Sequence, residues 1–486
     1  MSQYDIIIIG AGAGALSAAV QLAGKKRVLV IEAGPDPGGK MGRAQVEGVE
    51  FDTGPSVFTM TDVVASVFSN AGLDYRDYLE LIEVDGFSYL WPDKTALNIR
   101  FAKGDTLAEI ERVFGTKHAE EFKGFLDYTE EIWNAAAPNF VYGEAPSFGG
   151  AIKLGMTKFR ELMKIDPMRS MAAAIESRVS EPHLRDLLLR YATYNGSHPW
   201  RAPATLNCIA WVELGLGCYG IKGGMFRLAE ALEKAATEKG AEFVYNTRVT
   251  SILRAGKKVS GVMCGDTKFE APVVLCNADV SHLIHDLLED SPIKEAGEPS
   301  MSGWTGVIKA RRVPRPSHTV LFPARPYQQE FVDIFDRERL PEEPTIYLCA
   351  QEKSHQRPGW EDHEPIFAMI NAPYVKDINS APPAEEVADQ VADQIKQRLL
   401  AFDLIHPEDT WVWMRRPQDL AAQFPGSRGS IYGASSNSQF SAFQRPPNRV
   451  KDLPGLFLAS GSAHPGGGVP MCLLSGTAAA KQIFSN

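Results

Sequence analysis

The chain lacks an excess of positive charge, and this limits its partners. Its 486 residues carry 50 lysines and arginines against 60 aspartates and glutamates, which gives a formal net charge of −10 at pH 7. Proteins that bind nucleic acid generally present a basic face to the phosphate backbone. The charge balance therefore argues against nucleic acid as a partner.

Cysteine is scarce, and its spacing follows no known binding pattern. The six cysteines form no C-x-x-C pair and no other spacing typical of a metal site. Disulfide-rich secreted proteins and zinc domains both depend on such spacing. We therefore expect no metal, no disulfides and a reduced, cytoplasmic location.

Long uncharged runs are absent, with one exception at the N-terminus. The stretch from Ile6 to Gly24 approaches the length of a bilayer span and resembles a signal peptide or a membrane anchor. However, Asp5 precedes it where a signal peptide carries basic residues, and small residues interrupt it repeatedly. We therefore assign the stretch to a folded domain.

Familiar catalytic motifs are missing as well. The sequence contains no H-E-x-x-H, no G-x-S-x-G and no P-loop. Their absence fits a protein whose chemistry is supplied by a bound cofactor.

What the N-terminus does contain is a complete dinucleotide-binding pattern. The apolar run Ile6–Ile9 predicts a strand buried on both faces, and the glycine-rich turn GAGAGA follows at once. The helix expected from about 14 to 23 would direct unpaired N–H groups at a pyrophosphate. A second strand, expected over 27–31, ends on Glu32, 20 residues after Gly12, where a carboxylate can accept the ribose hydroxyls.

Two more glycine-rich turns follow soon after this unit. They are PGGK at 37–40 and GVEFDTGP at 48–55. Turns so close together suggest a backbone wrapped around an extended ligand rather than a NAD-type fold that continues into its next helix. This arrangement favours FAD over NAD.

Changes of pattern along the chain predict an α/β fold with a discontinuous nucleotide-binding domain. A helical pattern runs from about 105 to 190, and strand-like runs return over 241–252 and 271–278. We expect a Rossmann-like FAD-binding domain over 1–80, 221–280 and 441–486, a mixed-sheet substrate-binding domain over 81–104 and 281–440, and a helical, membrane-facing subdomain over 105–220.

The C-terminus predicts a second cofactor contact. A strand is expected over 456–459, a glycine-rich loop over 460–468, and a helix from Val469 with Pro470 in its first turn. The start of that helix would stabilise the negative charge on a flavin that has taken up hydride.

Together these motifs resemble the FAD-dependent carotenoid desaturases of the bacterial phytoene desaturase type, within the amine oxidase-like flavoprotein superfamily. The pattern departs from its commonest form at Ala15, where a third glycine is usual, and at Lys40, where arginine is frequent. The segment DTGPSVFTM is similar to the branch that desaturates hydroxylated carotenoids near their ends. The matching pieces, in order along nearly the full length, are GAGAGAL at 10–16, PGGK at 37–40, FDTGPSVFTM at 51–60, RAPAT at 201–205, GLGCYGIKGGM at 215–225 and LFLASGSAHPGGGVPMCLLSG at 456–476.

This resemblance implies a function and a set of partners. It implies FAD bound non-covalently, hydride passing from the polyene to flavin N5, and a substrate such as phytoene or a hydroxylated carotenoid. It also implies quinone or oxygen as the electron acceptor and a cytoplasmic protein attached peripherally to a membrane. A basic and apolar segment over 152–164 is the candidate membrane contact, although a solvated helix face explains it equally well.

The predicted site residues follow from these motifs. Asp52 and His464 are predicted to lie near the chemistry and are candidates for proton transfer. Each has a structural alternative, since Asp52 can cap the turn before Gly54 and His464 can hold the loop at Pro465. The predicted cofactor-binding residues are Gly10, Gly12, Gly14, Ala15, Glu32, Gly39, Lys40, Val249, Gly461, Gly468, Val469 and Met471.

Several alternatives stay open. The same scaffold could serve an amine or amino-acid oxidase, or an isoprenoid-binding protein without flavin chemistry. The glycines of 215–220 fit a dinucleotide pattern and could mark an NADPH site, although Gly223 and Gly224 intervene before the next helix. His282 and His285 share a helical face but lack a third zinc ligand.

Overall fold

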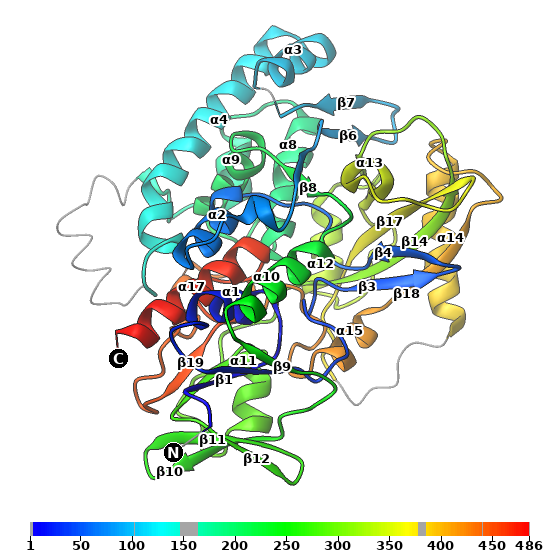
Figure 1. The fold of residues 1–486 in the computed structure, drawn as a ribbon. Helices are drawn as coiled ribbons and strands as arrows, with labels where there is room; N and C mark the ends of the chain where they lie inside the picture. Colours follow the sequence, from blue (N-terminus) through cyan, green and yellow to red (C-terminus); the bar gives the residue numbers. More distant parts are fainter. Residues whose placement is uncertain (1–2, 102, 146–163, 378–384, 440, 486) are drawn as a thin grey trace.

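The computed structural model describes residues 3–101, 103–145, 164–377, 385–439 and 441–485. One part of the fold is built on a five-stranded parallel sheet, whose strands β1, β9 and β19 are labelled in the lower part of Figure 1. The order is β19-β13-β1-β2-β9, and every neighbouring pair is parallel. The strands are β1 (Ile6–Ile9), β2 (Val28–Ile31), β9 (Glu242–Val244), β13 (Val273–Cys276) and β19 (Leu456–Leu458). Distant parts of the chain thus form one sheet, and the predicted α/β fold is confirmed; the predicted domain limits stay predictions.

The two faces of this sheet are covered differently. Ile6 and Ile8 face a layer of helices, whereas Ile7 and Ile9 face the antiparallel sheet β10-β11-β12. Burial on both faces explains why β1 is four isoleucines in a row rather than an alternating pattern. The covering elements are α1 (Ala13–Leu22), α2 (Thr61–Asn70), α10 (Phe226–Glu238), α17 (Val469–Phe484), β10 (Ser251–Ala255), β11 (Lys258–Cys264) and β12 (Thr267–Glu270).

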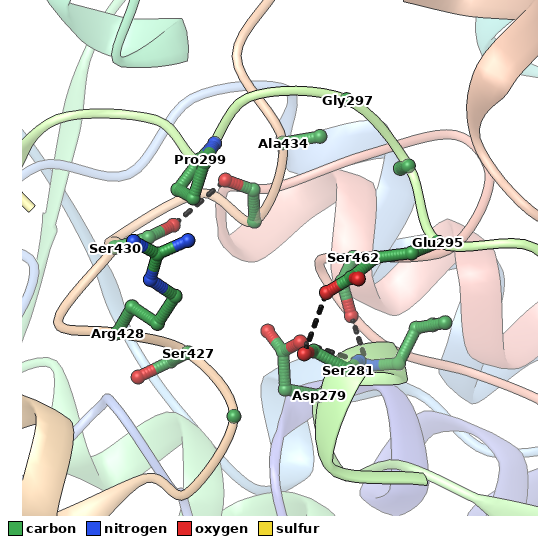
Figure 2. A pocket seen from close by; sticks show the side chains of 14 residues that line it. Asp279, Ser281, Glu295, Gly297, Pro299, Ser427, Arg428, Ser430, Ala434 and Ser462 are labelled. Carbon is green, nitrogen blue, oxygen red and sulfur yellow. Dashed lines mark hydrogen bonds between the residues drawn. The ribbon is translucent and has the colours of Figure 1, made fainter. Parts of the chain in front are cut away.

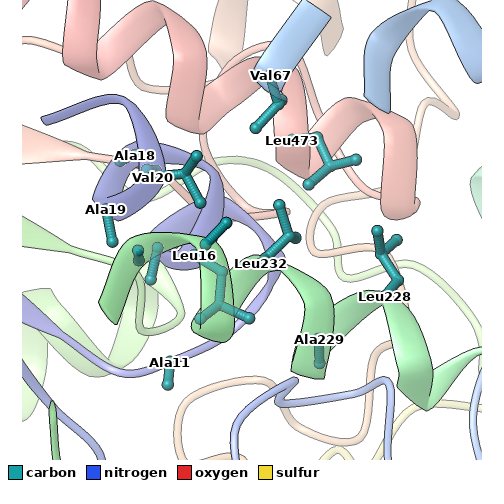
Figure 3. Close-up of a cluster of buried hydrophobic side chains, with 14 of the residues drawn as sticks. Ala11, Leu16, Ala18, Ala19, Val20, Val67, Leu228, Ala229, Leu232 and Leu473 are labelled. Carbon is teal, nitrogen blue, oxygen red and sulfur yellow. The ribbon is translucent and has the colours of Figure 1, made fainter. Parts of the chain in front are cut away.

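The first and last long helices of this layer are in close contact. Figure 3 shows side chains of α1, α10 and α17 meeting in one apolar cluster. The Ser17 hydroxyl donates to the Leu473 carbonyl at 2.7 Å, and a Cβ added to Gly476 would lie 2.2 Å from the Gly14 carbonyl oxygen. The absence of a side chain at Gly476 therefore lets α17 lie directly on α1.

One strand prediction is wrong. The run 241–252 is not one strand but two, β9 in the parallel sheet and β10 in the antiparallel sheet. Between them Asn246 adopts a φ of 52°, and the backbone N–H groups of Asn246 and Thr247 donate to the carbonyls of Gly34 and Glu32. The chain leaves the sheet here because it crosses the end of β2.

A seven-stranded mixed sheet forms the second part of the fold. Its order is β18-β14-β17-β16-β15-β6-β7, antiparallel throughout except between β15 and β6. Helix α14 packs on one face. The elements are β6 (Phe87–Leu90), β7 (Ala96–Ile99), β14 (Ser302–Arg311), β15 (His318–Leu321), β16 (Ile346–Ala350), β17 (His363–Ala372), β18 (Thr410–Arg415) and α14 (Glu385–Leu400).

Helices and two small antiparallel sheets of two strands each make up the rest of the described structure. Phe122 and Leu188 of the helical part pack with Phe87 and Val320 of the seven-stranded sheet. The remaining helices are α3 (Lys103–Phe114), α4 (Thr116–Ala136), α7 (Met171–Glu176), α8 (Pro182–Leu189), α9 (Cys208–Leu214), α11 (Val280–His282), α12 (Gln328–Phe335), α13 (Gln351–His355), α15 (Pro417–Gln423) and α16 (Ser441–Gln444), and the small sheets pair β3 (Arg43–Val46) with β4 (Val49–Asp52) and β5 (Leu81–Glu83) with β8 (Tyr219–Ile221).

The part of the chain that the structure describes contains no helix long and apolar enough to cross a membrane. The candidate membrane contact over 152–164 lies outside the described residues, apart from Lys164. That the helical part faces a membrane therefore stays a prediction.

Buried histidines make the stability of this fold depend on pH. Burial lowers the pKa of His198 from 6.5 to about 4, and it also lowers the pKa values of His318, His355 and His464. A histidine whose pKa is depressed by folding binds its proton more readily in the unfolded chain, so acid favours unfolding. We expect the free energy of unfolding to fall as the pH drops from about 6.5 to about 4, with His198 alone contributing up to about 3 kcal/mol.

Urea unfolding measured across this range of pH checks the prediction, with His198→Gln as the comparison. The variant should show a smaller loss between neutral and acidic pH. An equal loss in the variant and the parent would contradict the assignment to His198.

Candidate active site

The glycine-rich turn between β1 and α1 lies where the carboxyl ends of three parallel strands meet. The Gly12 N–H donates to Asn277 Oδ1 at 3.0 Å, and the Asn277 amide donates to the carbonyl of Ala459. Asn277 follows β13 and Ala459 follows β19. In the sheet, β2 lies on one side of β1 and β13 lies on the other, so the order of the strands reverses at β1. Such a reversal is a topological switch point, which is where open α/β sheets bind ligands.

Glycine is required at this turn because backbone segments approach each other closely. A Cβ on Gly14 would lie 2.3 Å from the Ala459 carbonyl oxygen, and one on Gly39 would lie 3.3 Å from Gly12 Cα. Gly39 also has a φ of 57°, in the left-handed region. The PGGK turn thus packs directly against the first glycine turn. This close packing is what we expect of backbone segments that surround an extended ligand.

The start of α1 is suited to an anion. In the described chain, no side chain accepts a hydrogen bond from the N–H groups of Ala13, Gly14 or Ala15. These groups carry the partial positive charge of a helix N-terminus. They are the groups that a pyrophosphate would bind.

Glu32 lies beside this turn, at the end of β2. Its carboxylate accepts from the N–H groups of Ala11 at 2.6 Å and Gly34 at 2.7 Å. The backbone pairing of Thr247 with Glu32 brings the segment that contains Val249 alongside. The structure thus brings Glu32, the predicted ribose contact, close to the segment with Val249, the predicted adenine contact.

Lys40 connects the PGGK turn to the loop that follows α15. Its ammonium donates to the carbonyls of Ser430 at 2.7 Å and Ile431 at 3.2 Å. Burial lowers the pKa of Lys40. The side chain is half-buried, so part of it remains accessible beside the PGGK turn.

Two arginines, Arg445 buried and Arg415 half-buried, add positive charge to the same region. Arg415 donates to the Thr53 carbonyl at 2.7 Å, and Arg445 donates to the carbonyls of Ala434 and Gly461 at 2.8 and 3.2 Å. Burial lowers the pKa of each arginine to about 10. The charges of Arg415 and Arg445 lie close enough to perturb Lys40 and Cys472, respectively. Anionic groups would be stabilised among these cations.

The start of α17 faces open space. Gly468 has a φ of 102°, and a Cβ added there would meet no atom within 4 Å. Val469 and Met471 follow it, half-buried, and Gly461 lies opposite, with its added Cβ 3.4 Å from Cys472 Sγ. This glycine loop leaves room for a flat ring beside the helix N-terminus. The glycine turns, the α1 N-terminus, the buried cations and this opening fit FAD.

Asp52 occupies a structural position. Its side chain accepts from the N–H groups of Met225 at 2.7 Å and Phe226 at 3.2 Å, and from Arg357 Nη1 at 2.8 Å. The residue is 1% exposed and caps the start of α10. The geometry favours a capping and ion-pairing role, and proton transfer by Asp52 stays a prediction.

His464 is similarly engaged with protein groups. Its Nε2 lies 3.1 Å from the carbonyl oxygen of Gly143, and its own carbonyl accepts from Asn448 and Ser475. Burial lowers its pKa, which favours the neutral ring near pH 7. These contacts favour the loop-holding alternative, and proton transfer by His464 also stays a prediction.

One small pocket lies beside this site, and a larger pocket lies away from the predicted site residues. The one in Figure 2, about 40 Å³, is lined by Asp279, Ser430 and Ser462 among others, and the Ser462 hydroxyl accepts from the Val280 N–H at 2.8 Å. It is large enough only for a few water molecules. A second pocket of about 390 Å³ is lined by Trp304, Tyr374 and Arg416 among others, and none of the predicted site residues borders it.

Sequence reasoning missed some of the residues that build this site. The position of Asn277 could have been predicted, because it directly follows the apolar run of a buried parallel strand, and ligand contacts are common at the ends of such strands. Arg415 and Arg445 carried no such signal, since Arg415 ends an otherwise apolar strand run, Arg445 stands before two prolines, and only the tertiary fold brings them to this site.

The alternative nucleotide and metal sites find no support in the geometry. The glycines of 215–220 run from the end of α9 into β8, and β8 pairs antiparallel with β5, so no strand–turn–helix unit forms there. His282 pairs with Asp286 and His285 pairs with Glu295. Over the described ranges, no three side chains of His, Cys, Asp or Glu are grouped as a metal site.

Comparisons with known proteins give the family. The family described as flavin containing amine oxidoreductase matches residues 15–484. The chain is 32% identical to hydroxyneurosporene desaturase of Rubrivivax gelatinosus, over 99% of this chain and 94% of the relative. It is 34% identical to hydroxyneurosporene desaturase of Rhodobacter capsulatus, over 100% and 98%, and 31% identical to 1-hydroxycarotenoid 3,4-desaturase of a Flavobacterium species, over 98% of each.

Solved structures show the same fold. An oxidoreductase from Methanosarcina mazei has a TM-score of 0.62 at 16% identity, over 99% of this chain and 100% of that one. A variant of putrescine oxidase has a TM-score of 0.61 at 13% identity, over 99% of each chain. The cofactor of this protein is FAD, as predicted, and the protein is an oxidoreductase. The chain belongs to the flavin-containing amine oxidoreductase family, in its branch of bacterial carotenoid desaturases.

Proposed function

We propose that the protein desaturates a carotenoid that carries a hydroxyl group near one end. The observation that carries this proposal is the similarity, over the whole chain, to three desaturases whose names specify hydroxylated carotenoids. In the reaction two adjacent carbons each lose a hydrogen, one as a hydride and the other as a proton, and a carbon–carbon double bond forms. FAD, when bound, supplies the acceptor for the hydride.

The residues of this chain have binding and orienting roles in the proposal. The α1 N-terminus and the glycines at 10, 12, 14 and 39 hold the pyrophosphate, and Glu32 holds the ribose. The loop from Gly461 to Gly468 and the start of α17 hold the flavin ring. No side chain is needed as a nucleophile, and Asp52 and His464 remain the predicted candidates for accepting the released proton.

We also propose that the protein works at a membrane surface and passes its electrons to quinone or oxygen. A long polyene dissolves in lipid rather than in water, so the enzyme must collect it from a bilayer. Sedimentation with liposomes tests the first part. Reoxidation of the reduced protein by a soluble quinone and by oxygen, followed by flavin absorbance, tests the second.

An assay in liposomes tests the reaction itself. The purified protein with FAD is mixed with vesicles that contain a hydrocarbon carotenoid or its 1-hydroxy derivative. A longer conjugated system shifts the polyene absorption to the red, and mass spectrometry shows the loss of two hydrogens. Peroxide release from putrescine with no change in either polyene would instead indicate an amine oxidase.

Lys40 is expected to make the flavin easier to reduce. A buried positive charge beside the ring would stabilise the negative charge that accompanies reduction. Lys40→Met removes that charge while keeping much of the side-chain volume, so the midpoint potential should become more negative. Spectroelectrochemical titration measures the shift, and Lys25→Met, at an exposed lysine, is the control. An unchanged potential in Lys40→Met would rule out this role.

A further inference from the structure

The small pocket shown in Figure 2 leads from the predicted flavin loop to the surface. One wall contains Ser462, which lies in that loop over 461–468, and the exposed residue Glu295. The opposite wall contains Ser430, which is 1% exposed and whose carbonyl accepts from the Lys40 ammonium. The volume of about 40 Å³ holds a few water molecules. Water in this pocket therefore connects the region of the cofactor with solvent.

Asp279 contributes a half-buried carboxylate to this pocket. Its Oδ1 accepts from the Ser281 N–H at 3.0 Å and so caps the start of α11. Within the described residues, no group donates to Oδ2, which is left for water in the pocket. One oxygen of the carboxylate is thus used by the fold, and the other can take up a proton.

Capping alone does not require a charge at this position. Asparagine or serine would cap a helix about as well as aspartate does. An ionised carboxylate also costs free energy to bury, whereas a neutral side chain avoids much of that cost. The charge of Asp279 therefore indicates a role besides capping.

The surroundings of Asp279 make its protonation sensitive to added charge. Burial raises the pKa of Asp279, and the positive charge of Lys40 opposes that rise. Asp279 likewise acts on Lys40, so each lies within electrostatic reach of the other. A negative charge placed near Lys40 would raise the pKa of Asp279 further. The titratable or charged groups that face Asp279 are Lys40 of the PGGK turn, Cys276 of β13, His282 of α11, Glu295 of the segment before β14, and Arg428 of the loop after α15.

Reduction of FAD creates such a charge. A hydride carries two electrons and one proton, so its uptake leaves the cofactor with one more negative charge than before. Lys40 contacts Ser430, and Ser430 and Asp279 line the same pocket. Binding of a proton by Asp279 would compensate the added charge without moving any part of the chain.

We propose that Asp279 binds a proton each time FAD is reduced and releases it when FAD is reoxidised, with the pocket of Figure 2 as the path to solvent. The polyene loses a hydride to FAD and a proton to water, and the Asp279 carboxylate takes one proton from the water in the pocket. The acceptor, quinone or oxygen, then takes up two electrons and two protons, one proton from the reduced cofactor and one from Asp279. The inference rests on bound FAD and goes beyond the proposed substrate.

The dependence of the midpoint potential on pH tests the inference. A two-electron couple shifts by about 30 mV per pH unit for each proton that it takes up. Around neutral pH we expect about 59 mV per pH unit in the parent, for two protons, and about 30 mV in Asp279→Asn, which keeps the cap but cannot bind the second proton. Asp74→Asn changes a similar cap, to the Arg76 N–H on the surface, and should leave the slope of the parent unchanged.

Infrared difference spectra identify the group that takes up the proton. Electrochemical reduction should give the parent a new carbonyl band of a protonated carboxyl, and Asp279→Asn should lack it. Lysine has no such band, so the spectra separate Asp279 from Lys40. Neither measurement needs a carotenoid, so a failure of the proposed desaturase function would leave both results interpretable.

Two results would overturn the inference. One is an equal slope in the parent and in Asp279→Asn, and the other is a parent spectrum without the carboxyl band. Flavin absorbance shows whether Asp279→Asn retains FAD. If it does not, the parent alone decides, since a slope of about 30 mV per pH unit would leave no second proton to assign.

Discussion

Gly14→Ala should yield a protein that no longer retains FAD. The added Cβ would lie 2.3 Å from the carbonyl oxygen and 2.9 Å from the carbonyl carbon of Ala459, and both are backbone atoms that cannot rotate away. The clash is relieved only if α1 moves off the loop that follows β19, which opens the cofactor site. Such overpacking also lowers the free energy of unfolding by about 1–3 kcal/mol.

A second glycine gives a matched control. Gly124 lies within α4, and a Cβ added there meets nothing within 4 Å. Gly124→Ala should therefore keep its FAD and gain about 0.5–1 kcal/mol of stability from its better helix propensity. The ratio of visible flavin absorbance to protein absorbance measures retention. A Gly14→Ala protein as yellow as Gly124→Ala would show that the close approach to Ala459 is unimportant.

Asp52→Ala should be the most destabilising of the single polar substitutions that we consider. It removes the acceptor for two N–H groups at the start of α10 and one partner of Arg357, whose side chain is 3% exposed. Breaking a buried ion pair costs about 3–5 kcal/mol, and Glu50 also contacts Arg357, so we expect the lower end of that range. Urea unfolding measures the loss, with Asp74→Ala, at the exposed pair with Arg76, as a control of small effect.

Asp52→Asn distinguishes the two roles predicted for this residue. The amide keeps an oxygen for one of the two α10 N–H groups, which Oδ1 and Oδ2 accept separately in Asp52, but it cannot take up a proton as a carboxylate does. A capping role predicts a folded, FAD-loaded protein that keeps most of its desaturase activity. A folded and loaded protein without activity would instead establish a role in proton transfer.

The local parts of the fold could be predicted from the sequence. The buried strand Ile6–Ile9, the glycine turn, Glu32 and the helix from Val469 each follow from residues that are neighbours in the chain. Their assembly at one place is confirmed by the contacts of Gly14 with Ala459 and of Ser17 with Leu473. Short-range patterns suffice here because the nucleotide unit is itself a local structure.

The rest depends on contacts between distant residues. The pairing of β6 with β15 joins residues more than 200 positions apart, and neither strand carries a signal for the other. The cap that Asp52 gives to α10 and the carbonyl contacts of Arg445 are also long-range. The break after β9 was missed because the β-favouring residues on both sides of Asn246 concealed a turn that only the contact with Gly34 explains.

The packing of α17 on α1 also bears on the synthesis of the active protein. Gly476 rests on the first turn of α1, so the two sides of the cofactor site come from segments that are made at very different times during translation. A polypeptide synthesised only as far as β13 has the pyrophosphate turn but not the helix that would hold the flavin ring. Tight binding of FAD is therefore expected only after α17 has been made and has packed on α1.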